Sequence, residues 1–186
     1  MIQLETDRLI LRNGSLTRPT AEQIRAGYEK YVVEYNDPSC SFEVYQDVVL
    51  FSYLQAKQGS KFGYYNLVLK GEEQVIGHCN FGPTLCPPEV VAIFGVSGNE
   101  FNLHSSLEIE IGWAVSKFYR RKGYATEGAK CLIEYGFKEL KLKRIVAFTK
   151  LSNPASICVM EKLGMKLAKH PENQEQIVGI IENCQL

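Results

Sequence analysis

One segment near the middle of the chain constrains the fold more than any other. Residues 107–115 form an apolar run, which leads into a basic stretch with a glycine, RRKGYATE, at residues 120–127. This order predicts a β-strand, then a turn, then a helix. The first amides of a helix have no partner within the helix and lie at the positive end of its dipole, so an anion is stabilised there. The segment therefore predicts a phosphate-binding turn, while a solvated basic turn would have the same local pattern.

The charge balance argues against a general attraction to polyanions. The chain has 186 residues, with 21 Lys and Arg against 21 Asp and Glu. This length fits one domain over residues 1–186, and the zero net charge provides no field toward nucleic acid or an anionic membrane. We therefore expect neither partner. A second basic group at residues 138–144 is expected to be a solvated face.

The cysteines and the amino terminus indicate a reducing compartment. No C-x-x-C pair and no ligand spacing with histidine is present, so we expect free core thiols, no disulfide framework and no metal. The first eight residues lack the apolar core of a signal peptide, and no uncharged run approaches the ~18 residues of a membrane span. These features predict a cytoplasmic location. The six cysteines are Cys40, Cys79, Cys86, Cys131, Cys158 and Cys184.

The rest of the chain predicts alternating strands and helices. We expect a first strand at 8–12, helices around 20–31 and 47–56, and a hairpin of 64–69 with 74–81. The strand at 107–115, a helix from about Ala125 and a strand at 143–148 follow one another, which implies parallel neighbouring strands. Asn153-Pro154 predicts the start of a helix that ends at Gly164, and a last strand is expected at 177–181.

The stretch between Gly82 and Ser106 is the least informative. Its apolar part, Val90 to Val96, predicts an ordered extra strand or a flap near the substrate, because a structureless loop of this length is unusual. An ordinary hairpin strand fits the same residues equally well.

Several motifs of the chain resemble those of a known family. Arg120-x-x-Gly123-x-Ala125 matches the Q/R-x-x-G-x-G/A signature of the GNAT superfamily of acyl-coenzyme A dependent N-acetyltransferases. Residues 110–115 resemble its fourth strand, and Asn153-x-x-Ser156 with residues 161–165 resembles its final helix and turn. Residues 5–12 resemble the opening strand of the RimJ/RimL branch, which acetylates ribosomal proteins. The resemblance implies an α/β (α+β) fold with a mixed, mostly antiparallel sheet flanked by helices.

The resemblance also implies a binding site for acetyl-CoA as cosubstrate. The coenzyme A pyrophosphate needs convergent amide donors and little side-chain bulk, and Gly123 and Ala125 meet the second need. In GNAT-like proteins the fourth strand parts from the fifth and hydrogen bonds to the pantetheine arm, and a strand amide then polarises the thioester carbonyl. The expected cofactor-binding residues are Trp113, Ala114, Val115, Arg120, Arg121, Lys122, Gly123, Tyr124, Ala125, Thr126 and Asn153.

Acetyl transfer to an amine needs a proton acceptor and a proton donor. A lysine amine with a pKa of ~10.4 is protonated at neutral pH, so the reaction needs a base. Glu110 is the candidate base, with Glu108 or a water chain as alternatives. In many GNAT enzymes a tyrosine donates this proton, and it stands seven residues after the Asn position. In this chain Met160 occupies the place of that tyrosine. The resemblance passes that role to Ser156, with Asn153 beside it, although a helix cap and a locally bonded hydroxyl would have the same spacing.

The sequence thus predicts an N-acetyltransferase that acts on a primary amine, either a peptide or protein N-terminus or a small amine. The alternative is a catalytically idle acyl-CoA sensor with the same fold. A nucleotide enzyme is disfavoured because no G-x-x-x-x-G-K-[ST] loop is present. A homodimer is possible, and His78, His104 and His170 are expected to have no role.

Overall fold

The computed structural model describes residues 2–13, 19–35, 40–57, 59–95, 100–102 and 105–183. These residues divide into two units, Met1–Asn80 with Trp113–Gly128 and Phe81–Gly112 with Ala129–Leu186. The expectation of one domain over the whole chain stays a prediction. Three elements contribute residues to both units: β4 (Gln74–Cys86), β6 (Ser105–Val115) and α4 (Tyr124–Lys138).

The strands of the first unit form an antiparallel ladder with a buried face. Besides the first part of β4, the unit has β1 (Gln3–Glu5), β2 (Leu9–Asn13) and β3 (Gly63–Leu69). β1 and β3 each pair antiparallel with β2. Alternate side chains of β2 are buried, with Leu9 and Leu11 at 0% exposure, as a strand with one face toward a core requires. The turn after β3 closes where the amides of Glu72 and Glu73 donate to the carbonyl of Leu69, and the predicted hairpin is therefore confirmed.

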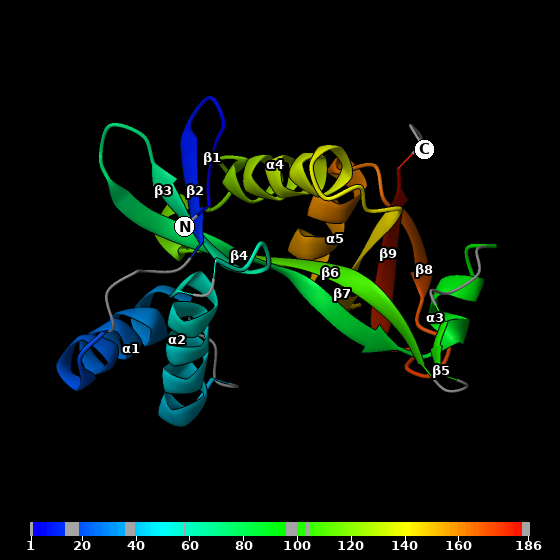
Figure 1. Ribbon diagram of the computed structural model, residues 1–186, viewed down its shortest axis with the longest axis horizontal. Coiled ribbons are helices and arrows are strands. Elements are labelled where there is room, and N and C mark those ends of the chain that lie inside the picture. The colour runs from blue at the N-terminus through cyan, green and yellow to red at the C-terminus, as the bar shows by residue number, and fades with distance from the viewer. Residues whose placement is uncertain are drawn as a thin grey trace. The chain divides into compact units, whose positions relative to one another are not determined.

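Two helices of the first unit, α1 (Ala21–Tyr35) and α2 (Phe42–Lys57), lie beside each other (Figure 1). Aromatic side chains join them. The ring of Tyr28 lies 5.4 Å from that of Phe42 and 5.7 Å from that of Tyr45. Gly27 gives the Tyr45 hydroxyl its space, because a Cβ at this position would lie 2.6 Å from it. Both predicted helices are present, and α2 begins earlier than the sequence indicated.

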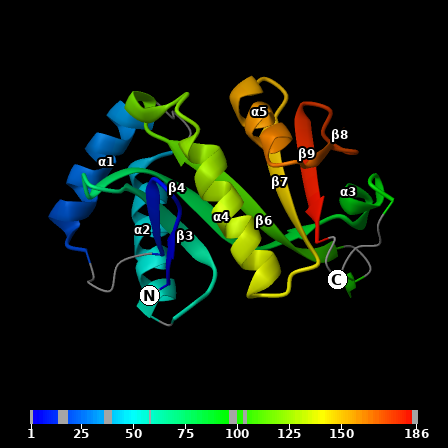
Figure 2. The ribbon, with the colours of Figure 1, turned by 90° about the horizontal axis from the view of Figure 1, so that it is seen from above.

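The second unit is built around β7, β9 and β8, in that order across the ladder (Figure 2). β7 pairs antiparallel with β9 over seven residue pairs, and β8 pairs antiparallel with β9. Val146, Val178 and Ile180 lie in a buried cluster whose other members are Cys86, the last residue of β4, and Val90 and Val91 of the segment after it. The bounds are β7 (Arg144–Lys150), α5 (Pro154–Lys162), β8 (Lys166–Lys169), β9 (Gln176–Glu182), α3 (Pro88–Ala92) and β5 (Glu100–Asn102).

Hydrogen bonding connects the strands in the order β1-β2-β3-β4-β6-β7-β9-β8, with β5 beside β6. β6 and β7 are parallel, as the intervening helix predicted, and the pairs of β1 with β2, β2 with β3, β5 with β6, β7 with β9 and β8 with β9 are antiparallel. The predicted mixed, mostly antiparallel sheet flanked by helices is therefore confirmed.

The strand expected at Val90 to Val96 is wrong. Residues 88–92 form helix α3, which begins with Pro88 in its first turn, and Val96 lies outside the described residues. Val90 and Val91 are completely buried in the core cluster, so they are core residues of the second unit. Pro87 and Pro88 fix the backbone for a helix start, and this local signal outweighs the β-branched side chains that follow it.

The expectation of core thiols holds for only part of the set. Cys79 and Cys86 are buried, Cys40 and Cys131 are half-buried, and Cys158 on α5 is exposed. Cys184 lies outside the described residues. In the described part of the chain, no helix combines the length and the apolar character needed to cross a membrane.

Candidate functional site

The turn that precedes α4 has an unusual backbone. Arg121 has a φ of 63° and Gly123 a φ of 84°, so two left-handed residues flank Lys122. Glycine adopts this region freely, whereas an arginine there is uncommon. Turns with such residues direct successive amides into one concavity that binds anions. The sequence indicated Gly123, but it had no signal for the left-handed Arg121.

The turn leads directly into the helix amides. The first helical hydrogen bond runs from the amide of Glu127 to the carbonyl of Gly123 at 3.0 Å. The amides of Tyr124, Ala125 and Thr126 precede that bond and therefore have no acceptor within the helix. The predicted strand, turn and helix are thus present, with amides, a bare glycine and exposed basic side chains in one place. This set fits a pyrophosphate.

The three basic residues of the turn have different surroundings. Arg120 donates from Nε to the carbonyl of Val115 at 3.1 Å and from Nη2 to that of Tyr35 at 3.5 Å. Its guanidinium therefore supports the end of β6 as well as adding charge. The Nζ of Lys122 lies 5.4 Å from the centroid of the Tyr119 ring, and Arg121 is exposed.

The end of β6 lies very close to β4. The amide of Ser116 donates to the carbonyl of Ile76 at 2.9 Å, and a Cβ on Gly77 would overlap the carbonyl oxygen of Ala114. Only glycine allows this approach. Val115 is 9% exposed and Trp113 and Ala114 are half-buried, so the side chain of Val115 serves the core. Gly77 was missed, because a lone glycine in a strand has no sequence pattern that identifies its neighbour.

The two candidate bases, Glu108 and Glu110, belong to the second unit and differ sharply. The Glu108 carboxylate is 1% exposed and accepts from Arg144, with Nε to Oε2 at 2.8 Å and Nη2 to Oε1 at 2.7 Å. Glu110 is half-buried. Burial raises the pKa of Glu110, and a hydrogen bond from Thr84 opposes that shift.

The pairing of β6 with β7 is short. Among the described residues the register of the two strands is fixed at Glu110 with Val146, whereas β7 and β9 pair along seven positions. Short pairing of this kind is what the resemblance implies for a fourth strand that parts from the fifth.

Asn153 and Ser156 contact each other at the start of α5. The Asn153 Oδ1 accepts from the amide of Ser156 at 3.2 Å, and the Asn153 Nδ2 donates to the Ser156 Oγ at 3.2 Å. Asn153 is therefore the predicted helix cap. Because Ser156 Oγ accepts in this contact, its own proton is left for another acceptor. Met160 is completely buried and takes no part at the surface.

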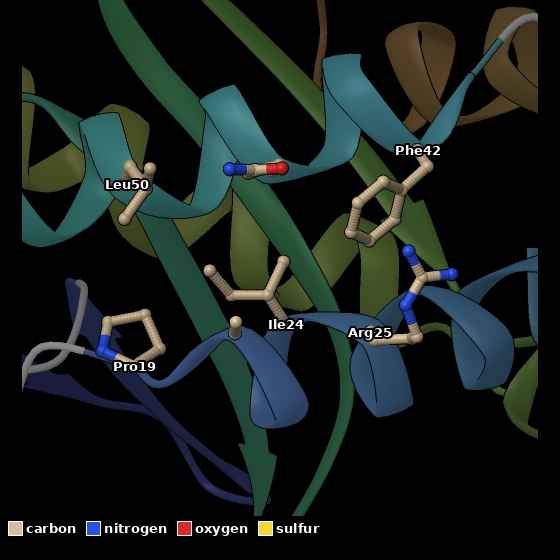
Figure 3. A pocket seen from close by; sticks show the side chains of 7 residues that line it. Pro19, Ile24, Arg25, Phe42 and Leu50 are labelled. Atoms are coloured by element: carbon tan, nitrogen blue, oxygen red, sulfur yellow. The ribbon is translucent and has the colours of Figure 1, made fainter.

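A separate pocket of about 270 Å³ lies between α1 and α2 (Figure 3). The Arg25 guanidinium stacks over the ring of Phe42 at 4.4 Å on one side of it. None of the residues expected from the sequence to bind or react lines this pocket. Its lining is Pro19, Ala21, Ile24, Arg25, Phe42, Gln46 and Leu50.

Comparison with known proteins decides the family. The model of the acetyltransferase (GNAT) domain matches residues 8–166. The chain belongs to the GNAT acetyltransferase family. An uncharacterized N-acetyltransferase of Bacillus subtilis, YnaD, is 30% identical over 115 residues, which cover 62% of this chain and 56% of the relative. A second relative, the uncharacterized protein YkkB of Bacillus subtilis, is covered over 43% of its length. The chain therefore spans about half the length of these two relatives.

Solved structures of this GNAT fold agree over nearly the whole chain. The ribosomal-protein-S5-alanine acetyltransferase from Vibrio fischeri has a TM-score of 0.65 at 18% identity and covers 100% of this chain and 98% of its own. RimL, a ribosomal L7/L12 acetyltransferase solved in complex with coenzyme A, has a TM-score of 0.63 at 12% identity, with 97% and 98% covered. These neighbours support the RimJ/RimL resemblance at the level of the fold.

Proposed function

We propose that this GNAT protein transfers the acetyl group of acetyl-CoA to a primary amine. The observation that supports the proposal most strongly is the turn of the first unit, where left-handed Arg121 and Gly123 lead into the free amides of α4. Residues 121–126 would hold the pyrophosphate through backbone amides, and Trp113 to Val115 would hold the pantetheine arm. The family resemblance also assigns coenzyme A binding to Asn153, which belongs to the second unit.

Glu110 accepts the proton that the amine gives up. In the reaction a bond forms between the amine nitrogen and the acetyl carbon, the bond from that carbon to sulfur breaks, and one proton passes from nitrogen to sulfur. The raised pKa of Glu110 makes the carboxylate a stronger base than an exposed one. Glu108 is the weaker candidate, because both of its oxygens bind Arg144.

Ser156 supplies the proton at the sulfur. Its oxygen accepts from Asn153, which orients the hydroxyl and leaves its proton for donation. The acceptor is a peptide or protein N-terminus or a small amine. The structural neighbours include acetyltransferases of both kinds, ribosomal-protein enzymes and a spermidine N-acetyltransferase.

An idle acyl-CoA sensor is the second candidate function. Met160 stands where many GNAT enzymes carry the proton-donating tyrosine, and it is completely buried. A sensor would bind acetyl-CoA and release no thiol with any amine.

A thiol-release assay over a panel of amines tests the proposal. We expect release with at least one peptide or polyamine, and Ser156→Ala should lower kcat about 10- to 100-fold with an unchanged KM for acetyl-CoA. Ser152→Ala, which removes an exposed hydroxyl in the preceding turn, is the matched control and should keep full activity. Binding without release for every amine would favour the sensor, and an unaltered kcat of Ser156→Ala across pH would remove Ser156 from the mechanism.

A further inference from the structure

Arg8, at the amino-terminal end of the chain, reaches the phosphate-binding turn of the same unit. Its Nη1 donates to the carbonyl of Lys122 at 3.0 Å. Lys122 is the residue between left-handed Arg121 and Gly123. The bond therefore holds the residue directly after Arg121, whose left-handed conformation costs about 1–2 kcal/mol because it is not a glycine.

The remaining guanidinium atoms of Arg8 bind a carboxylate in the first turns of α4. Nε lies 2.7 Å and Nη2 2.5 Å from Oε2 of Glu127, a two-point contact in which both groups are charged. Oε1 of the same carboxylate accepts from the amide of Arg8 at 3.0 Å and from Oγ1 of Thr6 at 2.5 Å. Burial raises the pKa of Glu127, but the bonds from Thr6 and Arg8 outweigh burial and lower it overall. Glu127 is thus ionised at neutral pH.

An ionised Glu127 near the amino end of α4 would repel a pyrophosphate bound there, unless a cation compensates it. Arg8 supplies that cation. Its guanidinium also stacks on the Tyr124 ring at 4.5 Å, and Nη2 would lie 3.4 Å from a Cβ on Gly123. Arg8 therefore contacts or borders three consecutive residues of the turn and helix start, Lys122 to Tyr124.

We propose that Arg8 is a positioning residue for the cosubstrate pyrophosphate, which holds the turn through the Lys122 carbonyl and neutralises Glu127. The proposal rests on the proposed function, because it requires coenzyme A at this turn. It assigns a role to a residue that the sequence placed only in an opening strand. Arg8 does not itself touch the reacting atoms.

The test compares two ligands that differ in the pyrophosphate. Calorimetry measures binding of coenzyme A, and the thiol-release assay compares acetyl-CoA with acetyl-pantetheine, which has no pyrophosphate. Arg8→Ala should weaken coenzyme A binding about tenfold, as expected for loss of charged hydrogen bonds. The KM for acetyl-pantetheine should stay unchanged, which a general loss of folding would not produce.

A second substitution separates the two parts of the role. Glu127→Gln in the Arg8→Ala background removes the uncompensated carboxylate and should recover part of the lost coenzyme A affinity. Arg8→Lys keeps the positive charge at this position but lacks the two-point contact with Glu127. Arg12→Ala is the matched control, because Arg12 lies on β2, the strand that begins directly after Arg8, and pairs with Glu73 at 3.3 Å. It should bind coenzyme A like the wild type.

The outcomes distinguish the two proposals. Equal weakening for acetyl-CoA and acetyl-pantetheine, or wild-type coenzyme A affinity of folded Arg8→Ala, would overturn the role of Arg8. Wild-type protein that does not bind coenzyme A at all would instead overturn the proposed function.

Discussion

Glu108 and Glu110 stand on the same strand and have opposite surroundings. Both carboxylate oxygens of Glu108 accept hydrogen bonds from Arg144. Burial raises the pKa of Glu110, and one hydrogen bond from Thr84 opposes this rise. Both oxygens of Glu108 are engaged by Arg144, so an amine would have to displace the arginine to reach them. These surroundings are why we propose Glu110 as the base.

Thr84→Val should raise the pKa of Glu110 further, because it removes the bond that stabilises the ionised form. If Glu110 is the base, as we propose, its carboxylate is the active form, so activity falls as pH falls through this pKa. We expect the acidic limb of the kcat/KM profile to move to higher pH in Thr84→Val, and Thr84→Ser to keep the wild-type limb. A profile that does not move would show that Glu110 is not the titrating base.

At the scale of elements, a buried ion pair connects β6 to β7 within the second unit. The side chain of Arg144 is 8% exposed and that of Glu108 is 1% exposed. Removing one partner leaves a buried charge without compensation, whereas removing both leaves a site for apolar packing. Removing one partner alone should therefore destabilise the protein more than removing both.

Arg144→Met should lower the free energy of unfolding by about 3–5 kcal/mol, measured by urea denaturation. The double variant Glu108→Leu with Arg144→Met should recover most of that loss. Lys166→Met is the control: Lys166 pairs with Glu182 at 3.1 Å across β8 and β9, but its side chain is 66% exposed, so a change below about 1 kcal/mol is expected. A small effect of Arg144→Met would contradict this account of the pair.

At the scale of the whole molecule, ligand binding is expected to stabilise the fold. A ligand present at about 100 times its Kd adds ~2.7 kcal/mol, which raises Tm by roughly 5–10 °C for a chain of this size. We expect coenzyme A to produce this shift in a thermal melt, and Gly123→Trp to abolish it, because Gly123 has a φ of 84°. An equal shift with ATP would contradict a site that prefers coenzyme A.

Local signals predicted much of the fold. The hairpin of β3 and β4, the strand and turn before α4, and the cap and end of α5 each depend on residues adjacent in sequence. The short strands β1 and β8 were missed, because three or four residues carry no periodicity and gain stability only from a partner strand. Helix α3 was misassigned for the related reason that a buried apolar run fits a strand or a helix equally.

The sequence by itself determined the family signature and the turn that begins α4, because glycine geometry and free helix amides are properties of a few consecutive residues. Only the tertiary structure decided that Glu108 is the paired glutamate, that Gly77 has no room for a side chain, and that Arg8 bonds to the carbonyl of Lys122. Each of those outcomes depends on atoms from segments far apart in the chain, such as Arg8 and Lys122, and no local pattern encodes such a contact.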